Sequence, residues 1–193
     1  VGHGWEAVCA TAAGSGQGGR KRYKRTIWGM VRRMKVLIVS DTHGRHGNYR
    51  KALEESGGFD VLIHLGDVEG GEDYIMASVN CEKHVIKGNN DFYSKLPKED
   101  VFYLNGKKIF ITHGHDYHVA FETERIERAG RERGADVVMF GHTHRPYLDV
   151  GDDVVLLNPG SLSYPRQDGR KGSYMMMEID GEGKMTFEQR YVD

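Results

Sequence analysis

The sequence predicts an α/β (α+β) fold in which two mixed β-sheets pack as a sandwich flanked by helices. The first half of the chain alternates short apolar runs with helix-like segments, and its last third holds only strand-like runs separated by turns. With 193 residues, the chain has room for one domain and hardly for two. Because sheets and helices must cover their apolar faces, two packed sheets with outer helices satisfy both halves of the pattern.

Each element follows from a residue pattern. Apolar or alternating runs bounded by turn residues predict strands, and longer amphipathic segments predict helices. Asn105-Gly106 predicts a hairpin turn, residues 119–131 predict the longest helix, and the strands after Gly141 predict a β-meander. We expect strands at 34–39, 61–65, 83–87, 101–105, 107–112, 136–140, 148–150, 154–157, 173–179 and 184–192, and helices at 48–56, 71–79 and 119–131.

Residues 1–33 differ from the remainder in composition. Residues 1–19 are rich in Gly, Ala and Ser, and residues 20–33 are basic with little periodicity. Such composition is typical of disordered segments. We expect residues 1–33 to be a disordered or non-native N-terminal extension, with a basic nucleic-acid arm as the alternative, and residues 34–193 to form the domain.

Charge and composition narrow the classes of partner. Residues 1–33 hold seven of the 27 basic residues and one of the 28 acidic residues, so the remainder has more acids than bases. An acidic domain is poorly suited to binding the nucleic-acid backbone. No apolar run approaches the roughly 20 residues of a spanning helix, and two cysteines form no disulfide framework. We expect a cytoplasmic protein without membrane or nucleic-acid partners.

Five apolar runs each end in residues that can bind a metal ion. In α/β sheets, ligands bind in the crevice outside the carboxyl ends of the strands, so residues at these five ends are expected to share one site. Oxygen and nitrogen donors of this kind suit Mn, Fe or Zn better than Ca. The donors that directly follow these runs are Asp41 and His43, Asp67, Asn89, His113, and His142 and His144.

The number and spacing of these donors favour two ions. Asp41 and His43 are two residues apart, which places both side chains on one side of an extended segment, and His142 and His144 repeat this spacing. Asp67 is the natural shared ligand, because a carboxylate can bridge two ions. Seven donors are too many for one small ion. Two ions that share a water produce a hydroxide nucleophile and hold phosphate oxygens during attack on phosphorus.

The ordered motifs resemble one enzyme family, the calcineurin-like metallophosphoesterases, and within it the small prokaryotic YfcE-type phosphodiesterases. The motifs are Asp-x-His at 41–43, Gly-Asp at 66–67, Gly-Asn-x-Asp at 88–91, Thr-His-Gly-His at 112–115, Gly-His-Thr-His at 141–144, and Asn158-Pro159-Gly160-Ser161. The resemblance implies that Asp41, His43, Asp67 and His144 bind the first metal. It implies that Asp67, Asn89, His113 and His142 bind the second.

By the same resemblance, we expect a metal-dependent hydrolase that cleaves small phosphodiesters, with Asp67, Asn89 and His115 in catalytic roles. The cofactor is expected to be two divalent ions, Mn²⁺ by preference, with Fe, Ni or Zn as alternatives, and the protein can form a homo-oligomer. Many relatives carry His where this chain has Asn90, and Asn cannot act as a general acid. We therefore expect a preference for good leaving groups, with His115 or His43 as a substitute acid.

Other functions of the same fold remain as alternatives. A retromer-type scaffold binds partners with little or no hydrolysis, but a decayed site is expected to lose ligands, and here all seven positions are filled. A nuclease would share the metal chemistry, and the acidic domain argues against it. A protein phosphatase is also disfavoured, because Gly88 has no preceding Arg and Asn90 is followed by Asp.

Overall fold

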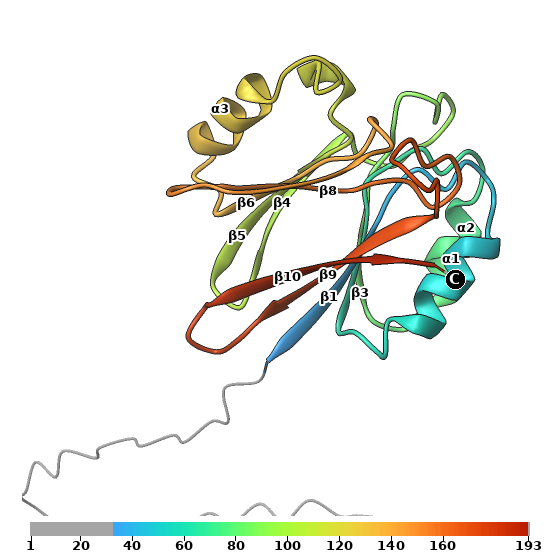
Figure 1. The fold of residues 1–193 in the computed structure, drawn as a ribbon, viewed down its shortest axis with the longest axis horizontal. Helices are drawn as coiled ribbons and strands as arrows, with labels where there is room; N and C mark the ends of the chain where they lie inside the picture. The colour runs from blue at the N-terminus through green and yellow to red at the C-terminus, as the bar shows by residue number, and fades with distance from the viewer. Residues whose placement is uncertain (1–32, 193) are drawn as a thin grey trace, which may run out of the picture. The chain divides into compact units, whose positions relative to one another are not determined.

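The computed structural model describes residues 33–192, which contain two five-stranded sheets, three α-helices and one short 3-10 helix, η1 (His115–Tyr117) (Figure 1). The first sheet has the order β10 (Met185–Tyr191), β9 (Ser173–Ile179), β1 (Met34–Val39), β2 (Val61–His64) and β3 (Glu82–Val85). The second has the order β4 (Glu99–Leu104), β5 (Lys107–Thr112), β6 (Val137–Met139), β8 (Val155–Pro159) and β7 (Pro146–Val150). The helices are α1 (Gly47–Glu55), α2 (Glu72–Ser78) and α3 (Glu124–Glu132).

Alternation along β1 shows how the layers are built. Successive side chains of a strand point to opposite faces of the sheet. Val36 and Ile38 therefore enter the core between the two sheets, whereas Leu37 and Val39 pack towards Tyr49 of α1. Both faces of this central strand are buried, which explains why its sequence is continuously apolar.

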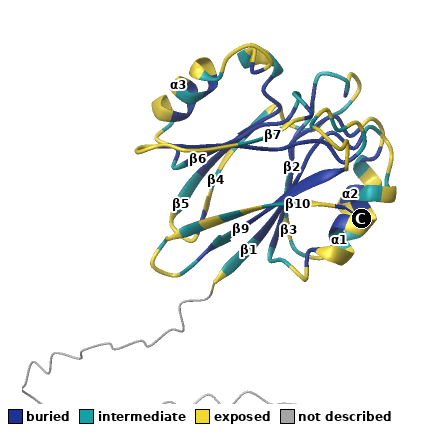
Figure 2. Cartoon of the chain, viewed as in Figure 1, coloured by how far each residue is buried: buried dark blue, intermediate teal, exposed yellow. Residues whose placement is uncertain are grey.

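The second sheet is covered in the same way by α3. Ile109 and Ile111 of β5 face the first sheet, whereas Phe110 packs with Ile126 and Ala129 of α3. The outer side of α3 is exposed, whereas β6 and β8 of the sheet that it covers are buried (Figure 2). The predicted sandwich of two mixed sheets flanked by helices is confirmed.

Because several neighbouring strands run parallel, the loops that follow them begin at the same edge of each sheet. In the first sheet β1, β2 and β3 run parallel, with Val39 beside His64 and His64 beside Val85. In the second sheet β5, β6 and β8 run parallel, with Ile111 beside Met139. Parallel neighbours end at the same edge, so the loops that follow β1, β2 and β3 start together, as do those that follow β5 and β6.

The hairpin between β4 and β5 is confirmed at Asn105 and Gly106, whose φ angles are 44° and 80°. Positive φ at both central residues is what a type I′ hairpin turn requires, and Asn-Gly meets this need at low cost. The expected disorder or non-native origin of residues 1–33 lies outside the described residues, apart from Arg33.

Two details of the expected architecture are wrong. The third helix starts at Glu124 instead of 119 and is no longer than α1, because residues before it form turns after His118, whose φ of 58° ends η1. The last four strands do not form one meander. β7 and β8 pair in the second sheet and β9 and β10 in the first, because β8 joins β6 and β9 joins β1. No helix within 33–192 has the length and apolarity needed to cross a bilayer.

Candidate metal centre

The loops after β1, β2, β3, β5 and β6 bring the seven candidate ligands together. Backbone hydrogen bonds join neighbouring loops: Asp41 N donates to Gly66 O (3.1 Å), His43 N donates to Asp67 O (2.9 Å), and Gly141 N donates to His113 O (3.1 Å). These bonds continue the parallel pairing of the strands beyond their ends. The structure therefore brings the starts of these loops side by side.

Four of the donors form a first ligand group, Asp41, His43, Asp67 and His144. One donor atom from each lies within 4.8 Å of the others. The His144 Nε2 atom is 3.1 Å from Asp41 Oδ1 and 3.3 Å from His43 Nε2. His43 Nε2 is also 3.9 Å from an oxygen of Asp67. These atoms surround a space of the size that one ion needs.

The remaining donors form a second ligand group around the same carboxylate, namely Asn89, His113 and His142 with Asp67. His113 Nε2 is 3.1 Å from Asn89 Oδ1 and 3.5 Å from Asp67 Oδ2. The rings of His113 and His142 are 5.3 Å apart between centroids. Asp67 Oδ2 thus faces His43 of the first group and His113 of the second.

Three of the four histidines are held through the ring nitrogen that faces away from the site. His43 Nδ1 is 2.7 Å from Glu69 Oε1, His113 Nδ1 is 2.7 Å from the Leu65 carbonyl, and His144 Nδ1 is 2.8 Å from the Tyr164 carbonyl. An N–H on Nδ1 donates to each acceptor and leaves Nε2 free to bind a metal. Such outer hydrogen bonds orient metal-ligating histidines.

Hydrogen bonds and neighbouring positive charges keep the two buried carboxylates ionised. Burial alone would raise the pKa of Asp41, but its interactions with the nearby imidazoles of His144 and His113 outweigh burial and lower that pKa. The pKa of Asp67 is also lowered, because His113 and the Asn90 N–H outweigh its burial. Burial lowers the pKa of His142 and so favours its neutral form. Metal binding needs ionised carboxylates and neutral imidazoles.

The residues fit a pair of divalent ions. Asp41 Oδ1 is buried and, among the described residues, has no hydrogen-bond partner, a costly state for a carboxylate unless a cation compensates it. A side chain at Gly88 would collide with Asp67, and one at Gly141 would collide with Ser40 and Asp41. The two glycines therefore allow the loops to come close enough for their donors to converge.

Most of the candidate ligands have an unusual backbone conformation. Left-handed φ is uncommon outside glycine and is retained where the surrounding structure enforces it, often at functional sites. At 45° to 67°, φ is left-handed at Asp41, His43, Asp67, His142 and His144.

The structure adds orienting residues to the site. Asn90 donates twice to Asp67, from its backbone N–H (2.9 Å) and from its side-chain amide (2.7 Å). Asp91 accepts backbone hydrogen bonds from Val68, Glu69 and Gly88. The Gly-Asn-x-Asp motif marks Asp91, but neither the Asn90 contact nor the role of Glu69 follows from sequence spacing.

His115, expected to have a catalytic role, lies beside the second ligand group. Its ring centroid is 5.5 Å from that of His113 and 6.1 Å from that of His142. Burial lowers the pKa of His115, which favours its neutral form. The structure therefore places His115 next to the ligands, outside the seven donors.

A family model described as the calcineurin-like phosphoesterase superfamily domain matches residues 34–182. The chain belongs to this superfamily. A probable metallophosphoesterase of Methanocaldococcus jannaschii is 35% identical over 136 residues, which are 69% of this chain and 70% of that protein. The phosphodiesterase YfcE of Escherichia coli is 29% identical over 172 residues, with 76% and 89% covered.

Solved structures agree on the fold. A predicted phosphoesterase of Streptococcus pneumoniae matches with a TM-score of 0.68 and 26% identity, over 82% of this chain and 99% of that chain. Vacuolar Protein Sorting 29 of Cryptosporidium parvum matches with a TM-score of 0.67 and 19% identity, over 83% and 99%. At that identity, the second likeness concerns the fold alone.

Proposed function

We propose that this protein is a dinuclear-metal-dependent phosphoesterase that hydrolyses phosphodiester bonds of small substrates. The observation that carries the proposal is the convergence of seven oxygen and nitrogen donors around one shared carboxylate, Asp67. Membership of the phosphoesterase superfamily and the likeness to proteins named phosphodiesterase support the reaction class.

The two ligand groups would hold one ion each. Asp41, His43 and His144 would hold the first ion and Asn89, His113 and His142 the second, with Asp67 as a candidate ligand of both. Two such ions, when bound, supply an acidified water for attack on phosphorus and neutralise charge on the phosphate. The mixed donor set supports Mn²⁺, with Fe, Ni or Zn as alternatives.

The chain's own residues define how the leaving group departs. Asn90 orients Asp67 and cannot donate a proton as a general acid. His115 lies beside the second ligand group without belonging to it and is our candidate for this acid. Burial lowers its pKa, so the neutral form is favoured. Substrates whose leaving groups need no proton should therefore react fastest.

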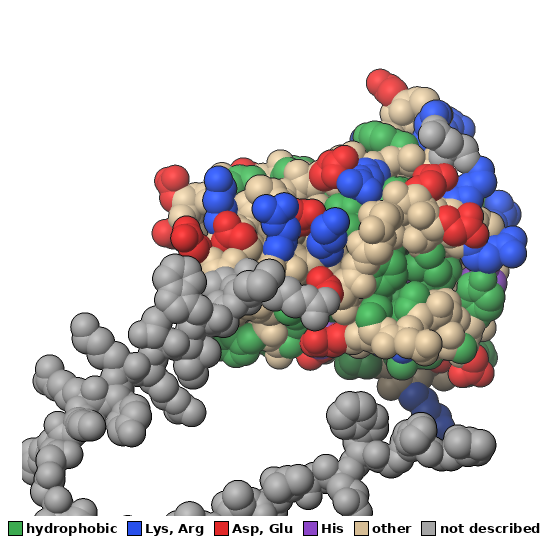
Figure 3. All heavy atoms as spheres, turned by 90° about the horizontal axis from the view of Figure 1, so that it is seen from below, with side chains coloured by type: hydrophobic (Ala, Val, Ile, Leu, Met, Phe, Trp, Pro, Cys, Tyr) green, Lys and Arg blue, Asp and Glu red, His purple; other side chains and the backbone are tan. Residues whose placement is uncertain are grey.

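Two other functions are less well supported. All seven ligand positions are filled, and three of the four histidines are held by hydrogen bonds, which favours an enzyme over a protein-binding scaffold. The likeness to Vacuolar Protein Sorting 29 concerns the fold alone. On the face drawn in Figure 3, Lys and Arg side chains lie among Asp and Glu side chains. This mixture disfavours a nuclease that binds along that face.

The deciding experiment uses metal-stripped protein with bis-p-nitrophenyl phosphate and p-nitrophenyl phosphate. Mn²⁺, Ni²⁺, Zn²⁺ and Mg²⁺ are added back in turn, and the release of nitrophenolate is followed. We expect metal-dependent turnover, faster for the diester and highest with Mn²⁺. Two bound ions per chain without turnover of either ester would overturn the proposed enzyme in favour of the scaffold.

A further inference from the structure

We propose that a cleft beside the metal centre binds a second phosphate group of the substrate, an inference that rests on the proposed phosphoesterase function. The arginine cleft is lined by the first-group ligands His43 and His144 and by Tyr164, Pro165 and three arginines, Arg145, Arg166 and Arg170. A substrate phosphate held at the first ligand group would therefore lie beside three arginine side chains. Simple phosphoesters leave these groups unused.

The loop that carries two of these arginines is fixed to the metal ligands. Arg166 donates its backbone N–H to the carbonyl of His144 (3.0 Å), and the carbonyl of Tyr164 accepts from His144 Nδ1 (2.8 Å). Ser161 Oγ donates to the Asp41 carbonyl (2.9 Å). Hydrogen bonds thus join the cleft loop directly to the first ligand group.

A fourth arginine stands at the rim of the cleft. The Arg45 guanidinium carbon lies 4.5 Å from the centre of the Tyr164 ring, and the same ring meets His43 edge-on at 4.9 Å between centroids. Stacking on an aromatic face fixes the guanidinium plane while its N–H groups remain available. Tyr164 therefore connects a metal ligand to a fourth positive charge.

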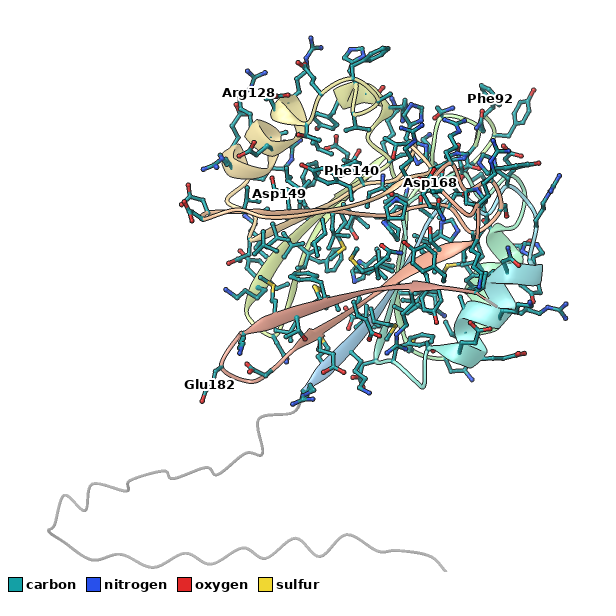
Figure 4. The ribbon with its side chains drawn as sticks, in the orientation of Figure 1. Phe92, Arg128, Phe140, Asp149, Asp168 and Glu182 are labelled. Carbon is teal, nitrogen blue, oxygen red and sulfur yellow. The ribbon has the colours of Figure 1, made fainter. Side chains whose placement is uncertain are left out.

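These four arginines differ from most arginines of the described chain. Arginine ion pairs within residues 33–192 use other residues, among them all four arginines of the α3 region. Four of the five described arginines that form no ion pair are Arg45, Arg145, Arg166 and Arg170. Asp168 is the only acid among residues 160–172. Figure 4 shows it on the opposite side of the view from Arg128 of α3.

The chemistry of the cleft specifies its ligand. Guanidinium groups bind phosphate oxygens through paired, charge-assisted hydrogen bonds, which discriminate phosphate from neutral groups. When bound, two divalent ions would neutralise the phosphate that is cleaved. Three or four further guanidinium groups without carboxylate partners suit another phosphate on the same molecule, as in a nucleoside bisphosphate ester.

Two substrates with the same scissile bond test this inference. Both are p-nitrophenyl esters of thymidine 5′-phosphate, and one carries a 3′-phosphate where the other has a 3′-hydroxyl group. We expect a kcat/KM for the 3′-phosphorylated ester at least about tenfold higher, the effect of one charge-assisted hydrogen bond. The double variant R166Q/R170Q should bring this ratio close to one, whereas R50Q, which removes an exposed arginine of α1, should preserve it.

A binding measurement separates this inference from the enzymatic proposal. Calorimetric titration of the Mn²⁺-loaded protein compares thymidine 3′,5′-bisphosphate with thymidine 5′-monophosphate. Tighter binding of the bisphosphate, lost in R166Q/R170Q, is expected whether or not the protein hydrolyses esters. Equal Kd values for the two nucleotides, or equal kcat/KM for the two esters in an active wild-type enzyme, would overturn the arginine cleft while leaving the phosphoesterase proposal intact.

Discussion

The two ligand groups share Asp67 but differ in charge and in how firmly their donors are held. The first adds a second carboxylate, Asp41, and both of its histidines are anchored through Nδ1. The second adds the neutral amide of Asn89, and its His142 ring contacts His113 and His115 without a side-chain hydrogen bond among the described residues. We infer that the first position binds its ion more tightly and that the second exchanges more readily.

This difference shows that similar donor counts do not make equivalent metal positions. Formal charge sets the electrostatic attraction, and orienting hydrogen bonds reduce the reorganisation needed when an ion binds. The four expectations below test this contrast, beginning with the residue that both groups share.

Replacing the shared ligand should have the largest effect. Asp67→Asn removes the bridging charge from both groups, so kcat/KM for bis-p-nitrophenyl phosphate should fall by more than the roughly 100-fold typical of losing an outer hydrogen bond. Metal content measured on the dialysed protein should fall as well. Asp152→Asn, an exposed turn residue, is the matched control. Activity within tenfold of wild type would contradict the bridging role.

Single replacements in each group should separate the two positions. His43→Asn should weaken the tighter of two Mn²⁺ binding steps, because it removes an anchored ligand of the first group. His142→Asn should leave that step in place and weaken the second. Equilibrium dialysis against Mn²⁺ gives both binding constants. If His142→Asn abolished the tighter step, the assignment of the two positions would be reversed.

The buried His64 should make the first group sensitive to acid. His64 Nε2 is 3.0 Å from Oγ1 of Thr42, the residue between Asp41 and His43 in the sequence. Burial lowers the pKa of His64 from 6.5 to about 4. The folded state therefore favours neutral His64, and stability present above pH 6.5 is lost as pH falls towards about 4. The loss is on the order of 3 kcal/mol.

Urea unfolding of the metal-free protein between pH 7 and pH 4 measures this loss. His64→Gln keeps a polar side chain that does not titrate, so its unfolding free energy should fall less steeply over the same range. Parallel curves for the two proteins would show that His64 is not responsible.

The smallest expected effect concerns Asn90, which orients the shared ligand from outside. Asn90→Ala should lower kcat/KM about tenfold, within the range for such partners, and should affect both metal-binding steps alike. Asn90→His would supply an imidazole at the position where many relatives have one. It should raise turnover of alkyl phosphodiesters relative to aryl phosphodiesters. Comparable wild-type turnover of both ester types would contradict the expected leaving-group preference.

The sequence predicted the parts of this molecule that depend on local pattern. Apolar runs predicted the strands of both sheets. Donor residues at the ends of these strands gave the seven candidate ligands, because neighbouring parallel strands end at the same edge of a sheet. The Asn105-Gly106 hairpin was predictable for the same reason, since its turn geometry depends on two residues.

What the sequence did not predict depends on contacts between distant segments. The last four strands are divided between two sheets because β8 pairs with β6 and β9 pairs with β1, both of which come earlier in the chain. The anchors of His43 and His144, namely Glu69 and the Tyr164 carbonyl, come from loops 26 and 20 residues away. The arginine cleft places Arg145 and Arg166 beside the candidate ligand His43. The spacing of these residues in the sequence does not predict that they meet.

The left-handed backbone at five candidate ligands implies a conflict between stability and activity. A non-glycine residue held in this conformation costs about 1–3 kcal/mol, so Asp67→Gly should unfold at a higher temperature than Asp67→Ala although neither retains the bridging carboxylate. Glycine at these positions would relieve this strain and would remove the side chains that the proposed metal binding needs. A protein of this fold that no longer needs hydrolysis could therefore gain stability by replacing these five residues with glycine. Glycine at these positions would then indicate that the protein descends from an enzyme.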